Sequence, residues 1–332
     1  MRAIRMGRFG GPEVLEPVEL PDPVPESGQV VIEVGHADVM YYEARTRRGE
    51  GFFTPPLPWI PGGAVGGVVA EVGAGVDPAW SGRRVVGRTV TGGGLPGGGY
   101  AERAVAEPAV LGAVPYGLSP REATALTHDG PTAVRLFDNA VSAGSLRPGA
   151  WVLVLAAAGG LGALLVQLAK AAGARVIAAA REERKLELAR AELGADAVVD
   201  YARPDWITYV RDVTGARGVD VVLDGAGGKT GLEAFALAAR GGRFSAHGAP
   251  GGGFAEIDPA EAAARGVTLV GIEQVQMTPG ETAPLLERAL LEAASGRLAP
   301  VVGQTFPLER AAEAHAAIES RTSVGKTLLT VG

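Results

Sequence analysis

A glycine-rich turn carries the first chemical signal in this sequence. It reads Ala157-x-Gly159-x-x-Gly162, the spacing of a dinucleotide-binding fingerprint with alanine in place of the first glycine. Glycines here let the backbone approach a pyrophosphate, and the N-terminus of the next helix offers free N–H groups and a positive dipole end. The turn therefore predicts a nucleotide site, although tight packing of a helix on a strand gives the same pattern.

The charges that follow the turn choose between nucleotides. An NAD site usually places Asp or Glu at the end of the second strand, whereas a 2′-phosphate requires cations there. The second strand ends at Ala180, and Arg181, Arg184 and Lys185 follow, with two glutamates among them. Cations that match a dianionic phosphate favour NADPH as the cofactor. The alternative is a solvated first helical turn of mixed charge.

A parallel sheet is needed to position these residues, and the sequence has the alternation of one. An apolar run at 151–157 is typical of a strand buried on both faces, and helical spacing then runs from Leu161 to a stop at Gly173. Further strands are expected at 175–180, 197–200, 219–223, 243–246 and 267–271, with helices at 183–193, 206–213 and 230–239. This pattern predicts a doubly wound sheet that binds ligands beyond the carboxyl ends of its strands, with 267–271 at the edge.

The segments on either side predict a second domain. The N-terminal third is rich in Gly and Pro and is expected to be all-β, with strands at 30–34, 67–72 and 84–86. Ser119 and Pro120 predict the start of a helix. Helices at 283–295 and 308–320 and strands at 303–306 and 326–331 are not needed by a six-stranded sheet, so we expect them to return to the first domain.

The domain boundaries follow from this arrangement. We predict one domain from residues 1–122 and 277–332, with a nucleotide domain inserted at 123–276 and a ligand cleft between the two. The glycine-rich segment 91–100 is either a lip of that cleft or a turn between strands.

Composition excludes several classes of function. The 31 Lys and Arg against 37 Asp and Glu give a net charge of -6 and no reason to expect nucleic acid or a membrane surface as a partner. The chain has no cysteine, which excludes disulfides, thiolate nucleophiles and zinc sites built on Cys. Its four histidines are scattered, so no metal site is expected, and the N-terminus lacks the apolar run of a signal peptide. We expect a cytoplasmic protein.

Five stretches together resemble a known family over nearly the whole chain. They are IPGGAVGGVVAEVGAGV at 60–76, GGYAERAVA at 98–106, AAAGGLGALLVQLAKAAGA at 156–174, ELGADAVVDY at 192–201 and ESRTSVGKTLL at 319–329. They are similar to the zinc-independent quinone oxidoreductase (zeta-crystallin-like) branch of the medium-chain dehydrogenase/reductases. The resemblance implies an α/β protein with a GroES-like β-rich catalytic domain and an inserted Rossmann domain. It also implies NADPH, a homodimer, and hydride transfer to a quinone or an activated alkene.

The resemblance implies cofactor contacts too. Arg181 begins the family's 2′-phosphate site, Lys185 falls on its phosphate-binding Lys, and Tyr201 falls on its adenosine-side Tyr. The alternatives are that Tyr201 is a half-buried core aromatic and that Arg321 is a surface cation at a helix end. The predicted cofactor-binding residues are Thr132, Ala158, Gly159, Gly160, Leu161, Arg181, Lys185, Tyr201, Gly225, Gly248 and Arg321.

Departures from the family leave the substrate open. In zinc-dependent relatives a catalytic Cys would fall at Met40 and a Gly-His-Glu at 62–64, so no zinc ligand remains here. Without a Lewis acid, a quinone or enone is an easier hydride acceptor than an aldehyde, because its enolate is protonated by solvent or a weak acid. Quinone reductases of this branch usually carry Asn at Met40 and Tyr at Arg45. The family's substrate therefore does not carry over.

Position alone suggests four candidates for catalysis at the substrate end: Tyr41, Tyr42, Arg45 and His128. Arg45 would orient a carbonyl oxygen or a developing enolate, and His128 or a tyrosine would deliver a proton. Alternatively, the tyrosines only fill the β-domain and His128 caps a helix. Met40 would make the pocket more apolar, which suits a flat hydrophobic acceptor.

Three functions stay open at this point. The first is an NADPH-dependent quinone reductase, and the second is a pathway-specific enoyl or enone reductase of a secondary metabolite. The third is a catalytically silent NADPH-binding protein.

Overall fold

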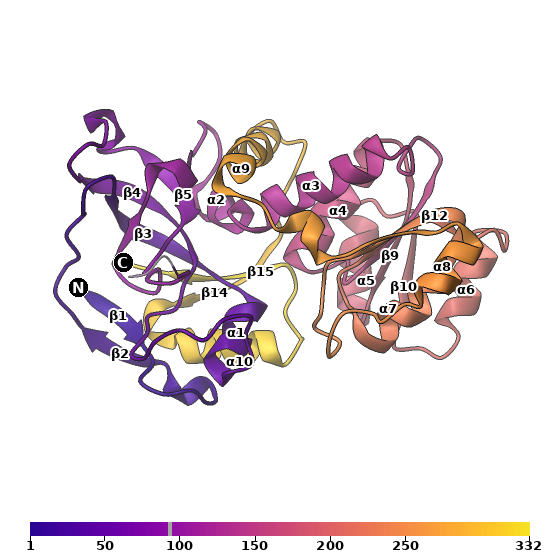
Figure 1. The fold of residues 1–332 in the computed structure, drawn as a ribbon, viewed down its shortest axis with the longest axis horizontal. Helices are drawn as coiled ribbons and strands as arrows, with labels where there is room; N and C mark the ends of the chain where they lie inside the picture. The colour runs from indigo at the N-terminus through magenta and orange to yellow at the C-terminus, as the bar shows by residue number, and fades with distance from the viewer. Residues whose placement is uncertain (92–94) are drawn as a thin grey trace. The chain divides into compact units, whose positions relative to one another are not determined.

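The computed structural model describes residues 1–91 and 95–332, which form two compact units (Figure 1). The β-rich unit comprises Met1–Pro131 and Thr278–Gly332, and the parallel-sheet unit comprises Thr132–Met277. The first boundary lies inside a helix, α3 (Asp129–Ser142), and not at the expected 122/123. A helix that continues across a boundary leaves no break in composition there. Among the described residues no helix is long and apolar enough to cross a membrane.

A seven-stranded sheet forms the centre of the β-rich unit, in the order β14-β15-β3-β4-β5-β7 with β6 paired to β3. The strands are β3 (Val30–Val39), β4 (Ala64–Val72), β5 (Arg84–Arg88), β6 (Arg103–Ala106), β7 (Leu111–Ala113), β14 (Val302–Pro307) and β15 (Lys326–Thr330), beside a separate pair β1 (Arg2–Arg5) and β2 (Glu16–Glu19). β15 pairs antiparallel with β3, so the expected return of the C-terminal segment to the first domain is confirmed. Ile32, Val65 and Leu329 are buried in the core of this unit.

The expectation of an all-β N-terminal third is wrong, because a helix, α1 (Tyr41–Arg48), follows β3 directly. Its buried residues are Glu43, Ala44, Thr46 and Arg47, so no apolar periodicity marks it in the sequence. The other helices of this unit are α2 (Pro120–Leu126), α9 (Pro279–Ala294) and α10 (Ala311–Glu319). The start of α2 is confirmed: Ser119 Oγ accepts from Glu122 N–H at 3.2 Å, and Pro120 begins the helix.

Six parallel strands form the second unit, in the order β10-β9-β8-β11-β12-β13. The strands are β8 (Trp151–Leu155), β9 (Arg175–Ala180), β10 (Ala197–Asp200), β11 (Val219–Asp224), β12 (Ala238–Ala246) and β13 (Thr268–Val270). The helices are α3, α4 (Gly160–Ala171), α5 (Glu183–Ala191), α6 (Trp206–Val213), α7 (Gly228–Phe235) and α8 (Pro259–Arg265). The doubly wound sheet and the edge position of its last strand are therefore confirmed.

One helix was predicted too long. The segment 230–239 was expected to be helical, but α7 ends at Phe235 and β12 begins at Ala238. The register of β12 against β11 shifts between Val219 and Val221, so the strand starts early and then bulges through Gly241 and Gly242. Gly241 and Gly242 interrupt the apolar run of β12, so the sequence pattern does not show where this strand begins.

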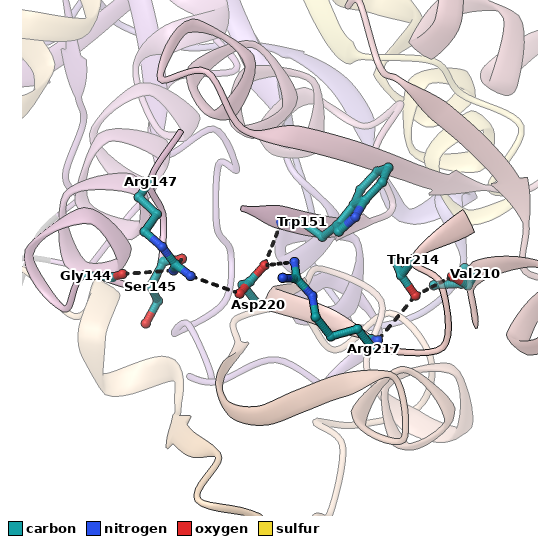
Figure 2. A network of polar contacts seen from close by, with 9 residues as sticks. Gly144, Ser145, Arg147, Trp151, Val210, Thr214, Arg217 and Asp220 are labelled. Atoms are coloured by element: carbon teal, nitrogen blue, oxygen red, sulfur yellow. Dashed lines mark hydrogen bonds and ion pairs between the residues drawn. The ribbon is translucent and has the colours of Figure 1, made fainter. Parts of the chain in front are cut away.

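The amino ends of β8 and β11 are joined by a polar network around Asp220 (Figure 2). The Asp220 carboxylate accepts from Trp151 N–H at 2.8 Å and pairs with Arg217 at 3.3 Å and Arg147 at 3.5 Å. Side chains thus fix this end of the sheet. The opposite, carboxyl end is formed by glycine-rich turns.

Candidate functional site

The turn after β8 has the backbone geometry of a phosphate cradle. Ala156 takes a left-handed conformation with φ 53°, Gly159 is the N-cap of α4, and Ala158 is buried. A Cβ on Gly162 would lie 2.3 Å from the Ala156 carbonyl oxygen, so only glycine fits where α4 packs on the strand. Gly159, Gly160 and Leu161 are half-buried, and the N–H groups of a first helical turn have no partner within the helix. This end of α4 can therefore bind an anion.

Two further glycine loops reach the same end of the sheet. Gly225 follows β11 and Gly248 follows β12, and a Cβ on Gly248 would lie 2.2 Å from the Gly225 carbonyl oxygen. A Cβ on Gly225 would in turn lie 3.0 Å from the Leu155 carbonyl oxygen at the end of β8. β8 lies between β9 and β11, and the chain runs outward from β8 through β9 to β10 on one side and from β11 through β12 to β13 on the other. Ligands of open α/β sheets bind at such a switch point.

The predicted cation site lies at the neighbouring strand ends. The Arg181 guanidinium stacks 5.4 Å from the centroid of the Tyr201 ring, which follows β10. Lys185 Nζ lies 3.5 Å from a carboxylate oxygen of Glu182, the N-cap of α5. The structure therefore brings Arg181, Lys185 and Tyr201 to one edge of the sheet. Their contact with a cofactor stays a prediction.

Two predicted cofactor residues lie apart from this group in the sequence. Thr132 is the first residue of the parallel-sheet unit and is 8 % exposed in α3. Arg321 belongs to the β-rich unit, where it follows α10 with φ 60°. Both remain predictions.

His247, which lies between β12 and Gly248, belongs to no motif in the sequence. Burial lowers its pKa to about 4, so the imidazole is neutral at physiological pH. Within the described part of the chain its Nδ1 is buried with no hydrogen-bond partner. A neutral ring beside the two glycine loops is a further candidate for cofactor contact, and only the strand topology reveals it.

The substrate-end candidates gather at the start of α1. Tyr41, Tyr42 and Arg45 are half-buried on this helix, with Met40 as its N-cap. The Tyr42 hydroxyl oxygen lies 2.7 Å from the point where a Cβ on Gly63 would be, and the Tyr42 ring centroid lies 6.1 Å from that of His128. The structure thus brings Tyr42, His128, Met40 and Gly63 together.

Burial keeps the Tyr42 hydroxyl protonated. Desolvation is the main cause that raises the pKa of Tyr42 well above its usual value, and the nearby Glu43 carboxylate adds to the effect. A neutral phenol is a hydrogen-bond donor at physiological pH. Tyr42 can therefore donate to a negatively charged oxygen.

His128 contacts a cluster of buried charged side chains. Its Nδ1 lies 3.4 Å from Asp129, and Lys326 Nζ lies 3.3 Å from Asp129 and 2.8 Å from Asp38. Burial raises the pKa of Asp38 to about 6, and the Lys326 ammonium and His128 hold the pKa of Asp129 down at about 2. Asp129 thus stays ionised and orients His128, whose side chain is 43 % exposed. No local spacing connects Asp38, Asp129 and Lys326, so the sequence pattern does not reveal this cluster.

No metal centre is found among the side chains of residues 1–91 and 95–332, where no group of three or more potential ligands comes together. The two positions at which the zinc-dependent relatives would place Cys and His hold Met40 and Gly63. Residues 92–94 of the expected cleft lip lie outside the described residues.

Two family models match the chain. Residues 26–116 match an alcohol dehydrogenase GroES-like domain, and residues 160–290 match a zinc-binding dehydrogenase domain. These ranges fall in the β-rich unit and largely in the parallel-sheet unit.

Whole-length relatives narrow the family. The chain is 33 % identical to quinone oxidoreductase of Rattus norvegicus, over 99 % of this chain and 97 % of that protein. Its structure is similar to that of the Escherichia coli quinone oxidoreductase complexed with NADPH, with a TM-score of 0.89, 27 % identity, and 99 % and 100 % of the two chains covered. It is also similar to an NAD-dependent alcohol dehydrogenase, with a TM-score of 0.88, 35 % identity and full coverage of both chains. The chain therefore belongs to the quinone oxidoreductase branch of the medium-chain dehydrogenase/reductase superfamily.

Proposed function

We propose that the protein is an NADPH-dependent, zinc-independent reductase that transfers hydride to a quinone or a similar conjugated carbonyl compound. The observation that carries the proposal is the placement of the Tyr42 hydroxyl beside Gly63. The zinc-dependent relatives would place a ligand side chain at that position, and here a neutral hydrogen-bond donor takes the space. Such a donor suits an acceptor whose reduction leaves an enolate or phenolate oxygen.

The residues present fit NADPH. The half-buried N-terminus of α4 offers N–H groups to a pyrophosphate, and the close packing of Gly225 on Gly248 keeps side chains out of the two neighbouring loops. Arg181 and Lys185 offer two cations for a 2′-phosphate. The E. coli relative was solved with NADPH, which supports this choice, whereas the similarity to an NAD-dependent enzyme makes the comparison with NADH necessary.

NADPH supplies a hydride when it is bound, and the residues of the β-rich unit act on the acceptor. Tyr42 donates a hydrogen bond to the acceptor oxygen as negative charge develops there. His128, held by Asp129, delivers a proton to the reduced product. Arg45, on the same helix one turn after Tyr42, orients the carbonyl oxygen, and Tyr41 lines the same helix end.

A second candidate is the pathway-specific enoyl or enone reductase. Met40 is 5 % exposed and puts an apolar side chain where quinone reductases of this branch usually carry Asn, and Arg45 replaces their Tyr. The flexible Met40 thioether and the Arg45 cation favour a single acceptor of defined shape, with its carbonyl in a fixed place, over a range of simple quinones.

The deciding experiment follows NADPH oxidation by absorbance, with a metal chelator present, against a panel of quinones and enones and with NADH in parallel. Rapid turnover of several simple quinones supports the leading proposal, and selective turnover of one enone class supports the second. Tight NADPH binding without oxidation by any acceptor would overturn both and leave a catalytically silent binding protein. Loss of activity with the chelator would overturn zinc independence.

We also propose that the protein works in the cytoplasm as a homodimer, with a small hydrophobic acceptor as its partner and neither nucleic acid nor membrane. β13 lies at the sheet edge, and its Thr268 and Leu269 are exposed, which leaves backbone groups free to pair with a second copy. Light scattering that gives the mass of one chain at working concentration would contradict the dimer.

A further inference from the structure

A buried glutamate connects the segments that form the substrate end. Glu43, at the third position of α1, is 1 % exposed. One carboxylate oxygen, Oε2, accepts from Met40 N–H at 3.0 Å, and the other, Oε1, accepts from Gly63 N–H at 2.8 Å. A single side chain therefore joins the N-cap of α1 to the turn that precedes β4.

A third donor completes the coordination of this carboxylate. The hydroxyl of Tyr100, which is fully buried, donates to Glu43 Oε2 at 3.1 Å and lies 3.0 Å from His315 Nε2. Burial lowers the pKa of His315 to about 3, so the ring is neutral. Because the single Tyr100 proton is donated to Glu43, the His315 tautomer that completes the chain carries its proton on Nε2 and donates to the tyrosine oxygen. The hydrogen bonds thus run in one direction, from α10 through Tyr100 to Glu43.

Every partner of the Glu43 carboxylate is a donor, so both of its oxygens act as hydrogen-bond acceptors. A glutamine of the same shape would turn an NH₂ group toward either Gly63 N–H or the pair of donors on Oε2. Two donors that face each other in a buried site leave both groups unsatisfied. Aspartate would keep the charge but is one methylene shorter, so it would lose one of the two backbone contacts.

We propose that Glu43 is the positioning residue of the substrate end, and that its carboxylate fixes Met40 and Gly63 relative to each other in the way a zinc ion fixes the ligands at those two positions in zinc-dependent relatives. This inference rests on the proposed function in one respect, because that function assigns catalysis to the substrate end. A Cβ on Gly63 would lie 3.7 Å from Glu43 Oε1 and 2.7 Å from the Tyr42 hydroxyl, so the turn held by Glu43 also sets the place of that hydroxyl.

The test replaces Glu43 and follows both structure and activity. Hydrogen exchange of the Met40 and Gly63 amides is measured in E43Q, E43D and wild type, together with kcat and KM for the best acceptor. We expect exchange at both amides to rise about tenfold or more in E43Q, and kcat/KM to fall by roughly 10–100-fold with NADPH affinity unchanged. E43D should lose protection mainly at one of the two amides.

A matched control and a milder variant keep the result interpretable. Glu281 makes the same capping contact on α9, where its exposed carboxylate accepts from Thr278 N–H at 3.0 Å. E281Q should leave both amides and kcat/KM unchanged. If E43Q does not fold, Y100F removes one donor and keeps both backbone contacts, so both amides should stay protected with only a few-fold loss of kcat.

The outcomes separate this inference from the proposed function. Met40 and Gly63 amides that stay protected in E43Q would overturn the positioning role. Loss of protection at these two amides in Y100F would also overturn it, because Glu43 keeps both backbone contacts in that variant. If wild type reduces no acceptor, the proposed function fails, and the exchange comparison still decides whether Glu43 fixes the two segments.

Discussion

The candidate cofactor site of the parallel-sheet unit, called the cofactor end below, and the substrate end in the β-rich unit are built in opposite ways. The cofactor end uses the backbone of glycine turns at the strand ends, with two cations and a tyrosine beside them. The substrate end uses side chains from β3, α1, Tyr100, His128, α10 and β15, with buried charges between them. A binding site made of backbone turns depends only on local sequence and local geometry. A site made of side chains from distant segments depends on the whole fold of its unit.

The charged side chains of the two ends also differ in their surroundings. Arg181 is exposed, and Lys185 is buried but pairs with the exposed Glu182, so an anionic ligand can compete for both cations. Glu43 and Asp38 are buried, and burial is the main cause that raises the pKa of each. Charges at the cofactor end therefore serve binding, and charges at the substrate end serve position.

The largest expected effect is steric and belongs to the backbone cradle. Gly162→Val would place a Cβ 2.3 Å from the Ala156 carbonyl oxygen, and α4 would have to move away from the strand. We expect a loss of about 3 kcal/mol in unfolding free energy and no measurable NADPH binding. Urea denaturation and fluorescence titration check this. Gly280→Ala, where a Cβ meets nothing within 4 Å, is the control and should behave as wild type.

The next effect separates the two nucleotides. The double variant R181A/K185A should bind NADPH about 100-fold more weakly and NADH with nearly unchanged affinity, because only the 2′-phosphate loses its partners. R217A, at the amino end of the same sheet, changes an arginine without touching the strand ends that bind the cofactor. Equal losses for NADPH and NADH would contradict the assignment of these cations.

The third prediction concerns the pH dependence of stability at the substrate end. Burial raises the pKa of Glu43 to about 7 from 4.5, and the Asp38 charge adds to the rise, while the N–H groups of Met40 and Gly63 and the Tyr100 hydroxyl oppose it. The folded state therefore holds this proton more tightly than the unfolded state. Its contribution to stability is complete below about pH 4.5 and is lost as the pH rises through 7.

The comparison of wild type with E43Q isolates that contribution. The difference in their unfolding free energies should shrink by on the order of 2 kcal/mol between pH 5 and pH 8. Asp38, Tyr100 and His315 are present in both proteins, so their own titrations largely cancel in the difference. Urea denaturation at the two pH values measures it, and a constant difference would show that Glu43 does not titrate in this range.

The smallest effect falls on a single hydrogen bond at the substrate end. Tyr42→Phe removes the hydroxyl beside Gly63 and should lower kcat about tenfold, with NADPH affinity unchanged. Steady-state kinetics with the best acceptor measures the change. Tyr209→Phe on α6 is the control. An unchanged kcat in Y42F would remove Tyr42 from the mechanism.

The sequence by itself determined the parts in which local pattern and local structure coincide. The turn Ala157-x-Gly159-x-x-Gly162 predicts the strand, turn and helix around it, because a glycine requirement and an apolar period are both local properties. Ser119 and Pro120 predict the start of α2 for the same reason. The return of the C-terminal strands to the first domain followed from counting the strands that one sheet needs.

Only the tertiary structure decided the substrate end. No apolar pattern in the sequence marks α1, because its buried face carries Glu43 and Arg47 in place of apolar residues. Glu43 meets Tyr100 and His315 across long stretches of chain, and Lys326 meets Asp38 and Asp129 in the same way. Whether a buried charge finds its partners depends on which strands and helices pack together, and no spacing within the sequence records that.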